Sequence, residues 1–464
     1  MRGVNELIVK KDTLIYQDKL FDLNDLFTEE LYRISNENVQ YYESNVCIVN
    51  EIFLNRVQPT IALTHFIEKN QIEYINIKEK ESSLYPILVD VANKCDVKIS
   101  GTSSFFGLYK IVFGNLTLLA SMVFILWKML KIPHSEKIIA KENKFSVIRT
   151  LAAQKKLFFL QDVNIRVEKL TDKKNVYNCF GRAKRVIWVL KAWIKSYREL
   201  GRYKNIIKGN IGTNSALDAF AYYSKRVIHT LLYSYMIDEY FEAYKGKTFY
   251  TGNNLDRFAI IEERAAKKYN IKTICIPHGL EYGFKLPHVF TCDEFYTTSE
   301  ITAEHLNDLY GTEKFIYKEE IAQQMFTVSC GKKKERSIVF FTEPREVFVN
   351  IKIIDEILPL MEKNHMRLSI KLHPKDKKID YEKYKGRVNF IENFNDSISR
   401  NICFSRKSTT LLEAIYNGSV SAAILTNAKD IAVFSTFTSL QDRRIKVFYS
   451  ISGLFDWIKR ESIV

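Results

Sequence analysis

The sequence predicts an α/β protein made of two doubly wound domains that face a central cleft. Three observations lead to this prediction. The chain has 464 residues, which is too long for one ordinary core and fits two α/β domains. Its composition, 46% hydrophobic with only 8 prolines, can fill two sizeable cores. Strand-like and helix-like apolar segments alternate through the second half of the chain, as they do in parallel α/β sheets.

The formal net charge of +15 implies an anionic partner: nucleic acid, anionic lipid or a charged substrate. Basic residues are spread along the chain without a recognised nucleic-acid-binding motif, which disfavours nucleic acid. The seven cysteines include no C-x-x-C pair, so neither a zinc site nor a disulfide framework is indicated. The segment from Met1 to Leu20 lacks the apolar core of a signal peptide. We therefore expect a cytoplasmic protein.

The first half of the chain contains three segments with a recognisable pattern. Residues Asn45 to Phe66 predict a strand, a loop and a helix, the first unit of a doubly wound sheet. The uncharged segment Ile111 to Trp127 lies between Lys110 and Lys128 and is slightly shorter than a usual membrane span of about 20 residues. Its length favours a buried helix over a membrane-embedded or re-entrant anchor.

A basic amphipathic helix is indicated from Arg182 to Lys204. Its apolar residues recur at helical spacing among many lysines and arginines, at Ile187, Leu190, Trp193 and Ile194. This pattern is typical of an interfacial anchor on an anionic membrane, and equally of a core stripe beneath a solvated charged face. Both interpretations remain open from the sequence.

From residue 247 onward the alternation becomes regular. A strand (Lys247 to Thr251), a helix (Asp256 to Tyr269) and a strand (Ile271 to Ile276) form a β-α-β unit. The polar run Cys330 to Arg336 is the clearest break in composition, and it divides the chain into domains 1–330 and 331–464. The second domain then alternates through Ser337 to Phe341, Val347 to Asn364, Arg367 to Leu372, Val388 to Ile391, Asn401 to Phe404, Thr409 to Tyr416 and Val420 to Leu425.

Ligands of parallel sheets bind beyond the carboxyl ends of the strands, and three motifs lie at such ends. The first is His278, which follows the strand ending at Ile276. Its near-neutral pKa suits a base that takes a proton from an attacking hydroxyl, with Glu281 as the rival base or orienting group. A loop histidine that only satisfies backbone groups is the alternative.

The second motif follows the strand from Arg367 to Leu372. Pro374 ends that strand and leaves His373 projecting, with Lys371 and Lys375 close by. Such a cationic group can hold the phosphate of a leaving nucleotide. An ordinary surface turn is the alternative.

The third motif lies between a strand and the helix that follows it. Ser408, Thr409 and Thr410 bring hydroxyls and free N–H groups to the start of that helix, where a phosphate can bind. Glu413, about one turn further, could accept hydrogen bonds from ribose hydroxyls. Helix capping by Ser408 or Thr409 is the alternative and is compatible with phosphate binding.

The order of these motifs resembles bacterial sialyltransferases and polysialyltransferases of the GT-B fold, two Rossmann-like domains around a cleft. It is also similar to the polyol-phosphate and Kdo transferases of capsule and wall polymer synthesis. The resemblance covers residues 247 to about 425. It implies that His373 and the Ser408 to Thr410 cluster bind the donor phosphate, that Thr342 and Glu343 lie near the donor, and that His278 or Glu281 is the base. Polysialyltransferases carry an acidic pair where this chain has Pro277 and His278, which matches polyol-phosphate transferases better.

The resemblance implies an inverting glycosyltransferase that moves sialic acid or a similar sugar from a CMP-activated donor onto an oligosaccharide or glycolipid acceptor. Domain 1–330 would bind the acceptor and carry membrane-associating helices, and domain 331–464 would bind the nucleotide-sugar. No cofactor and no metal is expected, in keeping with the lack of a D-x-D motif. The enzyme would work at the cytoplasmic face of the inner membrane, on its anionic surface.

Four other functions remain open. The same site could use a CDP-polyol donor for polyol-phosphate transfer, or a UDP-sugar. A non-catalytic nucleotide-sugar-binding subunit would keep the phosphate residues without the base. The basic charge also fits a nucleic-acid-binding or scaffold protein.

Overall fold

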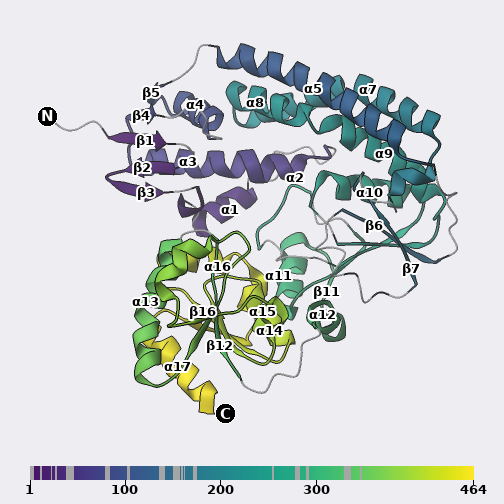
Figure 1. The fold of residues 1–464 in the computed structure, drawn as a ribbon. Helices are drawn as coiled ribbons and strands as arrows, with labels where there is room; N and C mark the ends of the chain where they lie inside the picture. The colour runs from purple at the N-terminus through teal and green to yellow at the C-terminus, as the bar shows by residue number, and fades with distance from the viewer. Residues whose placement is uncertain are drawn as a thin grey trace. The chain divides into compact units, whose positions relative to one another are not determined.

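The computed structural model of the protein describes residues 5–10, 13–21, 23–26, 29–37, 46–78, 84–101, 105–134, 142–149, 157, 160, 162–170, 175–252, 255–276, 283–288, 292–328, 336–344 and 347–463. These residues form two compact units (Figure 1). The first contains the described residues up to 276 together with 284–288 and 292–295, and the second contains residue 283 and those from 296 onward. The run Cys330 to Arg336, where the sequence divides the chain, lies outside the described residues except for Arg336.

The first unit begins with a mixed five-stranded sheet of order β3-β2-β1-β4-β5. Strands β1, β2 and β3 form an antiparallel meander, and β4 and β5 continue the sheet in parallel with β1. In β1 the side chains alternate, with Leu7 and Val9 buried. The strands are β1 (Glu6–Lys10), β2 (Thr13–Tyr16), β3 (Lys19–Phe21), β4 (Tyr74–Ile77) and β5 (Lys98–Ser100).

A continuous helical stretch replaces the strand that the sequence predicts near Asn45. Helix α2 (Val49–Ile52) runs through a π-helical turn into α3 (Gln58–Lys69). The predicted strand is wrong because an apolar run fits a buried helix as well as a strand. Val49, Ile52 and Phe53 are all buried at helical spacing. The helical part of the prediction is confirmed.

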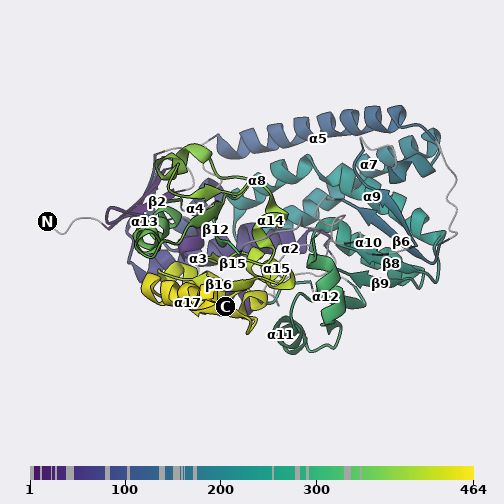
Figure 2. The same ribbon diagram turned by 60° about the horizontal axis from the view of Figure 1, so that its bottom comes forward.

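Four long helices make up a helical layer of the first unit. Helix α5 contacts α7 and α8, and α9 contacts α7 (Figure 2). Among the described residues, α5 is the helix that is long and apolar enough to cross a membrane. The interpretation of its sequence as a buried helix is wrong, because only Gly114, Leu118, Ile125 and Met129 are buried. The helices are α5 (Phe106–Lys131), α7 (Arg182–Asn210), α8 (Thr213–Ser224) and α9 (Val227–Glu242).

The chain then forms a six-stranded parallel sheet of order β11-β10-β9-β8-β6-β7. The predicted β-α-β unit is confirmed, with α10 (Arg257–Lys268) between β8 and β9. Asp256 begins α10 by accepting hydrogen bonds from the backbone N–H groups of the first turn. The strands are β6 (Lys144–Ile148), β7 (Val163–Val167), β8 (Thr248–Thr251), β9 (Lys272–Cys275), β10 (Glu294–Tyr296) and β11 (Phe315–Ile316).

The second unit is built on another six-stranded parallel sheet, of order β14-β13-β12-β15-β16-β17. Helices α13 (Val347–Lys363) and α17 (Ile451–Ile463) pack on it and share a core with Phe340, Ile370 and Phe404. The strands and helices predicted for this region are confirmed. The strands are β12 (Ile338–Phe341), β13 (Leu368–Lys371), β14 (Asn389–Phe390), β15 (Ile402–Ser405), β16 (Val420–Ile424) and β17 (Ile445–Phe448).

Two parallel sheets flanked by helices are compatible with a two-domain Rossmann-like layout. In the second unit β12 and β15 lie at the centre of the sheet. Strands β13 and β14 follow outward beside β12, and strands β16 and β17 follow outward beside β15. The strand order therefore reverses between β12 and β15. Such a reversal is the point of a doubly wound sheet at which ligands bind, because the loops leaving the two strands run to opposite faces.

Candidate functional site

The carboxyl ends of β12 and β15 bring the predicted donor residues to the reversal point of the second unit. Thr342 and Glu343 directly follow β12, and Arg406 to Ser408 follow β15. The two strands pair in parallel, so these loops leave the same edge of the sheet. His373 follows β13, the neighbour of β12 on the other side. Local sequence thus places polar residues after three adjacent strands.

Hydrogen bonds join the loops after β12 and β13. The Thr342 hydroxyl accepts a hydrogen bond from the backbone N–H of His373 at 2.9 Å and donates one to the Asp376 carboxylate. The His373 Nδ1 atom accepts from the backbone N–H of Lys375 at 3.1 Å. In the neutral ring the proton is therefore on Nε2, ready to be donated to a ligand.

The pKa of His373 lies below its ordinary value. Burial lowers it, the charge of Lys375 lowers it further, and Asp376 opposes both. The ring is consequently neutral at pH 7. Its Nε2–H group can donate a hydrogen bond to a phosphate oxygen without carrying a charge.

The two predicted lysines differ in their surroundings. Lys371 donates a hydrogen bond from Nζ to the backbone carbonyl oxygen of Glu392 at 2.9 Å, and Glu392 follows β14. Lys375 is exposed, as is Pro374 between it and His373. Lys375 is thus the better placed of the two to meet a ligand from solvent.

A buried ion cluster fixes the loop after β15. The Arg406 guanidinium donates to both carboxylate oxygens of Asp430, at 2.6 and 2.7 Å, and neither side chain is exposed. Lys407 also contacts the Asp430 carboxylate through Nζ. Its backbone N–H donates to Glu343 Oε1 at 2.5 Å. Asp430 belongs to α16 (Ala428–Ser435), so this cluster joins the ends of β12, β15 and β16.

The pKa values of the two acids shift in opposite directions. Burial raises the pKa of Glu343, and Lys407 and Arg406 oppose this rise only in part. Burial also acts to raise the pKa of Asp430, but its hydrogen bonds and ion pairs with Arg406 and Lys407 outweigh burial and lower it. Asp430 therefore stays ionised and holds both cations.

The hydroxyl cluster begins α15 (Thr410–Tyr416). The Ser408 hydroxyl accepts a hydrogen bond from the Thr410 backbone N–H at 3.3 Å and donates to the Thr410 hydroxyl at 3.0 Å. Thr409 makes no side-chain capping bond. Glu413 lies half-buried in the first turn. Ser408 thus accepts the first N–H of the helix from the position before its N-cap, Thr409, and the hydroxyls stay at the strand-end edge.

The structure thus brings together the predicted donor residues of three loops. Thr342 is hydrogen-bonded to the His373 segment, and Glu343 to the segment that precedes Ser408. Sequence reasoning missed Arg406 and Asp430. Arg406 lies inside the Ser/Thr motif, but its partner is 24 residues further along the chain. The predicted bases His278 and Glu281 lie outside the described residues.

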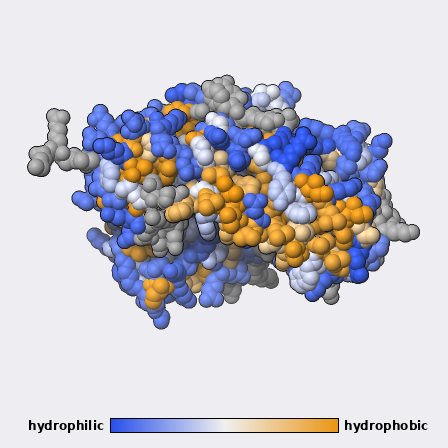
Figure 3. All heavy atoms as spheres, turned by 90° about the horizontal axis from the view of Figure 1, so that it is seen from above, coloured by the Kyte–Doolittle hydropathy of each residue, from blue (hydrophilic) through white to orange (hydrophobic). Residues whose placement is uncertain are grey.

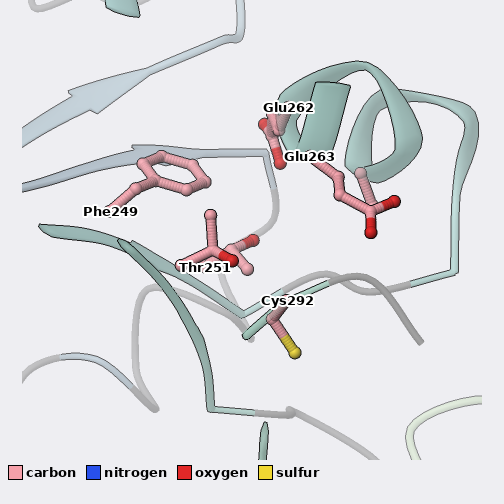
Figure 4. A pocket seen from close by; sticks show the side chains of 7 residues that line it. Phe249, Thr251, Glu262, Glu263 and Cys292 are labelled. Atoms are coloured by element: carbon pink, nitrogen blue, oxygen red, sulfur yellow. The ribbon is translucent and has the colours of Figure 1, made fainter. Parts of the chain in front are cut away.

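The first unit carries a second buried network, beside its own parallel sheet. Arg149, which follows β6, donates to Asp256 at 3.0 and 3.1 Å and contacts Glu262. The Tyr233 hydroxyl also donates to Glu262. Figure 4 shows Glu262 and Glu263 projecting from α10 near Thr251 of β8, with a pocket between the elements. The pocket offers space for about one water molecule, which is too little for a substrate.

Glu262 should make the stability of the first unit depend on pH. Burial raises its pKa to about 7, and Arg149 and the Tyr233 hydroxyl oppose this rise. The stabilising contribution of the protonated carboxyl is then present below pH 4.5 and is lost as the pH rises through 7. We expect the free energy of unfolding to fall by up to about 3 kcal/mol between pH 5 and pH 8. Glu262→Gln should remove most of this slope in urea titrations; an unchanged slope would mean that another group titrates.

Among the residues that the structure describes, no three His, Cys, Asp or Glu side chains lie close enough together to hold a metal ion. The candidate site therefore consists of hydrogen-bond donors, hydroxyls and paired charges.

Comparisons with known proteins assign no family and no function to these residues. No protein-family model matches this chain, and no curated protein matches it.

Proposed function

We propose that this chain is an inverting glycosyltransferase of the GT-B type, which transfers a sugar from a nucleotide-sugar to a cell-surface glycan. The observation that carries the proposal is the reversal of strand order between β12 and β15 in the second unit. Thr342, His373 and Ser408 lie after three neighbouring strands at this reversal. Doubly wound sheets bind nucleotides at such points.

The donor phosphate would be held by hydrogen bonds and by one exposed cation. His373 offers Nε2–H, and Lys375 adds a positive charge from solvent. Arg406 and Lys407 are paired with Asp430 and Glu343, so their contribution is to fix the backbone of the loop that carries Ser408. Fixed donors of this kind need no reorganisation as charge develops on the leaving phosphate.

The reaction would be a single in-line displacement at the anomeric carbon. The acceptor hydroxyl oxygen forms the new bond to carbon while the bond from carbon to the phosphate oxygen breaks. The phosphate leaves with the electron pair, next to His373 and Lys375. His278 or Glu281 would take the proton of the hydroxyl, a role that rests on the resemblance. The donor expected from that resemblance is a CMP-activated sugar.

His373→Ala should weaken binding of the nucleotide by about ten- to a hundredfold, since a hydrogen bond to a charged group contributes about 1.5–3 kcal/mol. Calorimetric titration with CMP, CDP, UDP, UMP and GDP, each with and without magnesium, measures this. His365→Asn is the matched control, because His365 is an exposed histidine with a left-handed backbone that asparagine tolerates.

The nucleotide preference separates the rival donors. Tight binding of CMP or CDP supports a sialic acid, Kdo or polyol-phosphate donor, because attack at phosphorus in a CDP-polyol also releases CMP. Binding of UDP or GDP keeps the glycosyltransferase and changes its donor. If none of the five binds, or if His373→Ala binds as the unmodified protein does, the donor site is elsewhere or absent.

The variants His278→Ala and Glu281→Gln should bind the nucleotide as the unmodified protein does. If neither variant lowers the rate of sugar transfer, the chain is a nucleotide-sugar-binding subunit or uses another base.

A further inference from the structure

Helix α5 exposes one broad apolar face along its whole length. With about 3.6 residues per turn, the large apolar side chains exposed on it occupy an arc of roughly 220°, and all but Ile111 lie within roughly 160°. Each of them is 43% to 62% exposed. Figure 3, which looks down on this face, shows apolar side chains gathered over it. They are Leu108, Tyr109, Ile111, Val112, Phe113, Leu116, Leu119, Val123, Phe124, Trp127 and Leu130. An apolar surface of this size marks an interaction site.

The opposite face of α5 is firmly attached to α8. A Cβ atom at Gly114 would lie only 2.5 Å from the ring of Phe220, so the two helices approach closely at this glycine. Lys110 Nζ is 2.7 Å from Asp218 of α8, and Leu118 is completely buried. Helix α5 therefore cannot leave α8 without breaking an ion pair and opening a packed contact.

Helix α7, which contacts α5, exposes an apolar stripe of its own. Its members recur at spacings of three and four residues, at Ile187, Leu190, Ile194 and Tyr197. Exposed lysines and an arginine alternate with them, at Lys191, Lys195 and Arg198. The interpretation of this stripe as a core stripe is wrong, since α7 buries a different set that includes Trp188 and Ala192.

The charged residues of α5 are all positive. Helix α5 contains Lys110, Lys128 and Lys131 and no acidic residue. The Nζ atoms of Lys128 and Lys131 lie 4.9 and 4.1 Å from the centre of the Trp127 ring. Lysines and a tryptophan at the border of an apolar surface suit the interface of an anionic bilayer. A second copy of the chain seated on this face would bring like charges together.

We propose that α5 lies flat in the interface of an anionic bilayer and anchors the first unit without crossing the membrane. At about 1.5 Å per residue its 26 residues span about 39 Å, so its length alone would permit crossing a core of about 30 Å. Packing excludes it, because a crossing helix would expose the Lys110 and Asp218 pair and the face vacated on α8. This proposal is independent of the proposed function, as it uses no residue of the donor site.

The experiment is co-sedimentation with vesicles of phosphatidylcholine and phosphatidylglycerol in a 7:3 ratio. We expect the unmodified protein to bind these vesicles, and Leu116→Gln with Leu119→Gln to reduce the bound fraction at least tenfold. The matched control is Ile379→Gln with Ile463→Gln, which changes two exposed isoleucines of the second unit. Circular dichroism checks that each variant is folded. Equal binding by the α5 variant and the unmodified protein would overturn the proposal.

Orientation is tested with a reducible fluorophore on Leu108→Cys or Leu130→Cys, with the unsubstituted protein as the labelling background. Dithionite added outside the vesicles should quench both labels, because both ends of an in-plane helix face the outer surface. Protection of one label would mean that α5 spans the bilayer. Light scattering without lipid should show a monomer; a dimer that the Leu116→Gln and Leu119→Gln changes abolish would instead assign the face to a second copy.

Discussion

Replacing Asp430 by alanine should lower the free energy of unfolding of the second unit by about 3–5 kcal/mol. The Arg406 guanidinium would lose both of its carboxylate contacts while it remains fully buried. A buried charge that loses its carboxylate is costly because it has given up its hydration. Lys407 loses the same partner. Urea titration followed by hydrogen exchange measures the effect, because the exchange of individual peptides gives the stability of each unit separately.

Glu362→Ala is the matched control. Glu362 accepts two hydrogen bonds from the Arg387 guanidinium, at 2.8 and 2.9 Å, so the pairing geometry is the same. Both of these side chains are nearly half exposed, and solvent screens the pair. This variant should lose far less stability than Asp430→Ala. Equal losses in the two variants would show that burial does not decide the strength of the Asp430 cluster.

Phe145→Ala should lower the free energy of unfolding of the first unit by about 3–5 kcal/mol. Phe145 is fully buried in β6, where its ring lies 4.1 Å from that of Tyr244 and about 5 Å from those of Phe241 and Phe249, centre to centre. Alanine would lose the transfer free energy of the ring and leave a cavity among rigid neighbours. The same hydrogen-exchange measurement follows the peptides of β6 and β8.

Two further variants provide reference values for the loss of stability in Phe145→Ala. Phe145→Leu should cost less than the alanine variant, because it keeps most of the side-chain volume. Phe348→Ala, at a phenylalanine that is 69% exposed, should change stability within about 0.5 kcal/mol. A loss below about 1 kcal/mol for Phe145→Ala would mean that the surrounding rings collapse into the space.

The strands and the helices α13 and α15 of the second unit between Ser337 and Leu425 could be predicted from the sequence, whereas α16, β17 and α17 were not predicted. Its strands are apolar, its helices amphipathic, and turn-forming residues separate them, so local pattern and tertiary environment agree. Helix α13, expected from Val347 to Asn364, runs from Val347 to Lys363. The position of His373 followed from the same logic, because parallel strands deliver their carboxyl ends to one edge, whereas Thr342 was expected near the donor from the family resemblance.

The first unit could be predicted only in part. Strands of the amino-terminal sheet, such as β3 (Lys19–Phe21), are too short to show a clear alternation. The burial of α5 depends on which neighbours are present, and its composition does not carry that information. The pairing of Arg406 with Asp430 joins the loop after β15 to helix α16, and no local sequence pattern predicts such a contact.

Most of the large apolar side chains that are exposed in the described part of the chain belong to helices, and this determines how the protein should behave when overproduced. A helix satisfies its own backbone hydrogen bonds, so α5 offers neighbouring molecules only side chains. The six edge strands of the three described sheets are short, with two or three residues in β3, β5, β11 and β14, four in β17 and five in β7, and they give little template for strand addition. Aggregation of the purified protein should therefore be reversible by mild detergent, and the aggregates should not convert to amyloid-like fibrils.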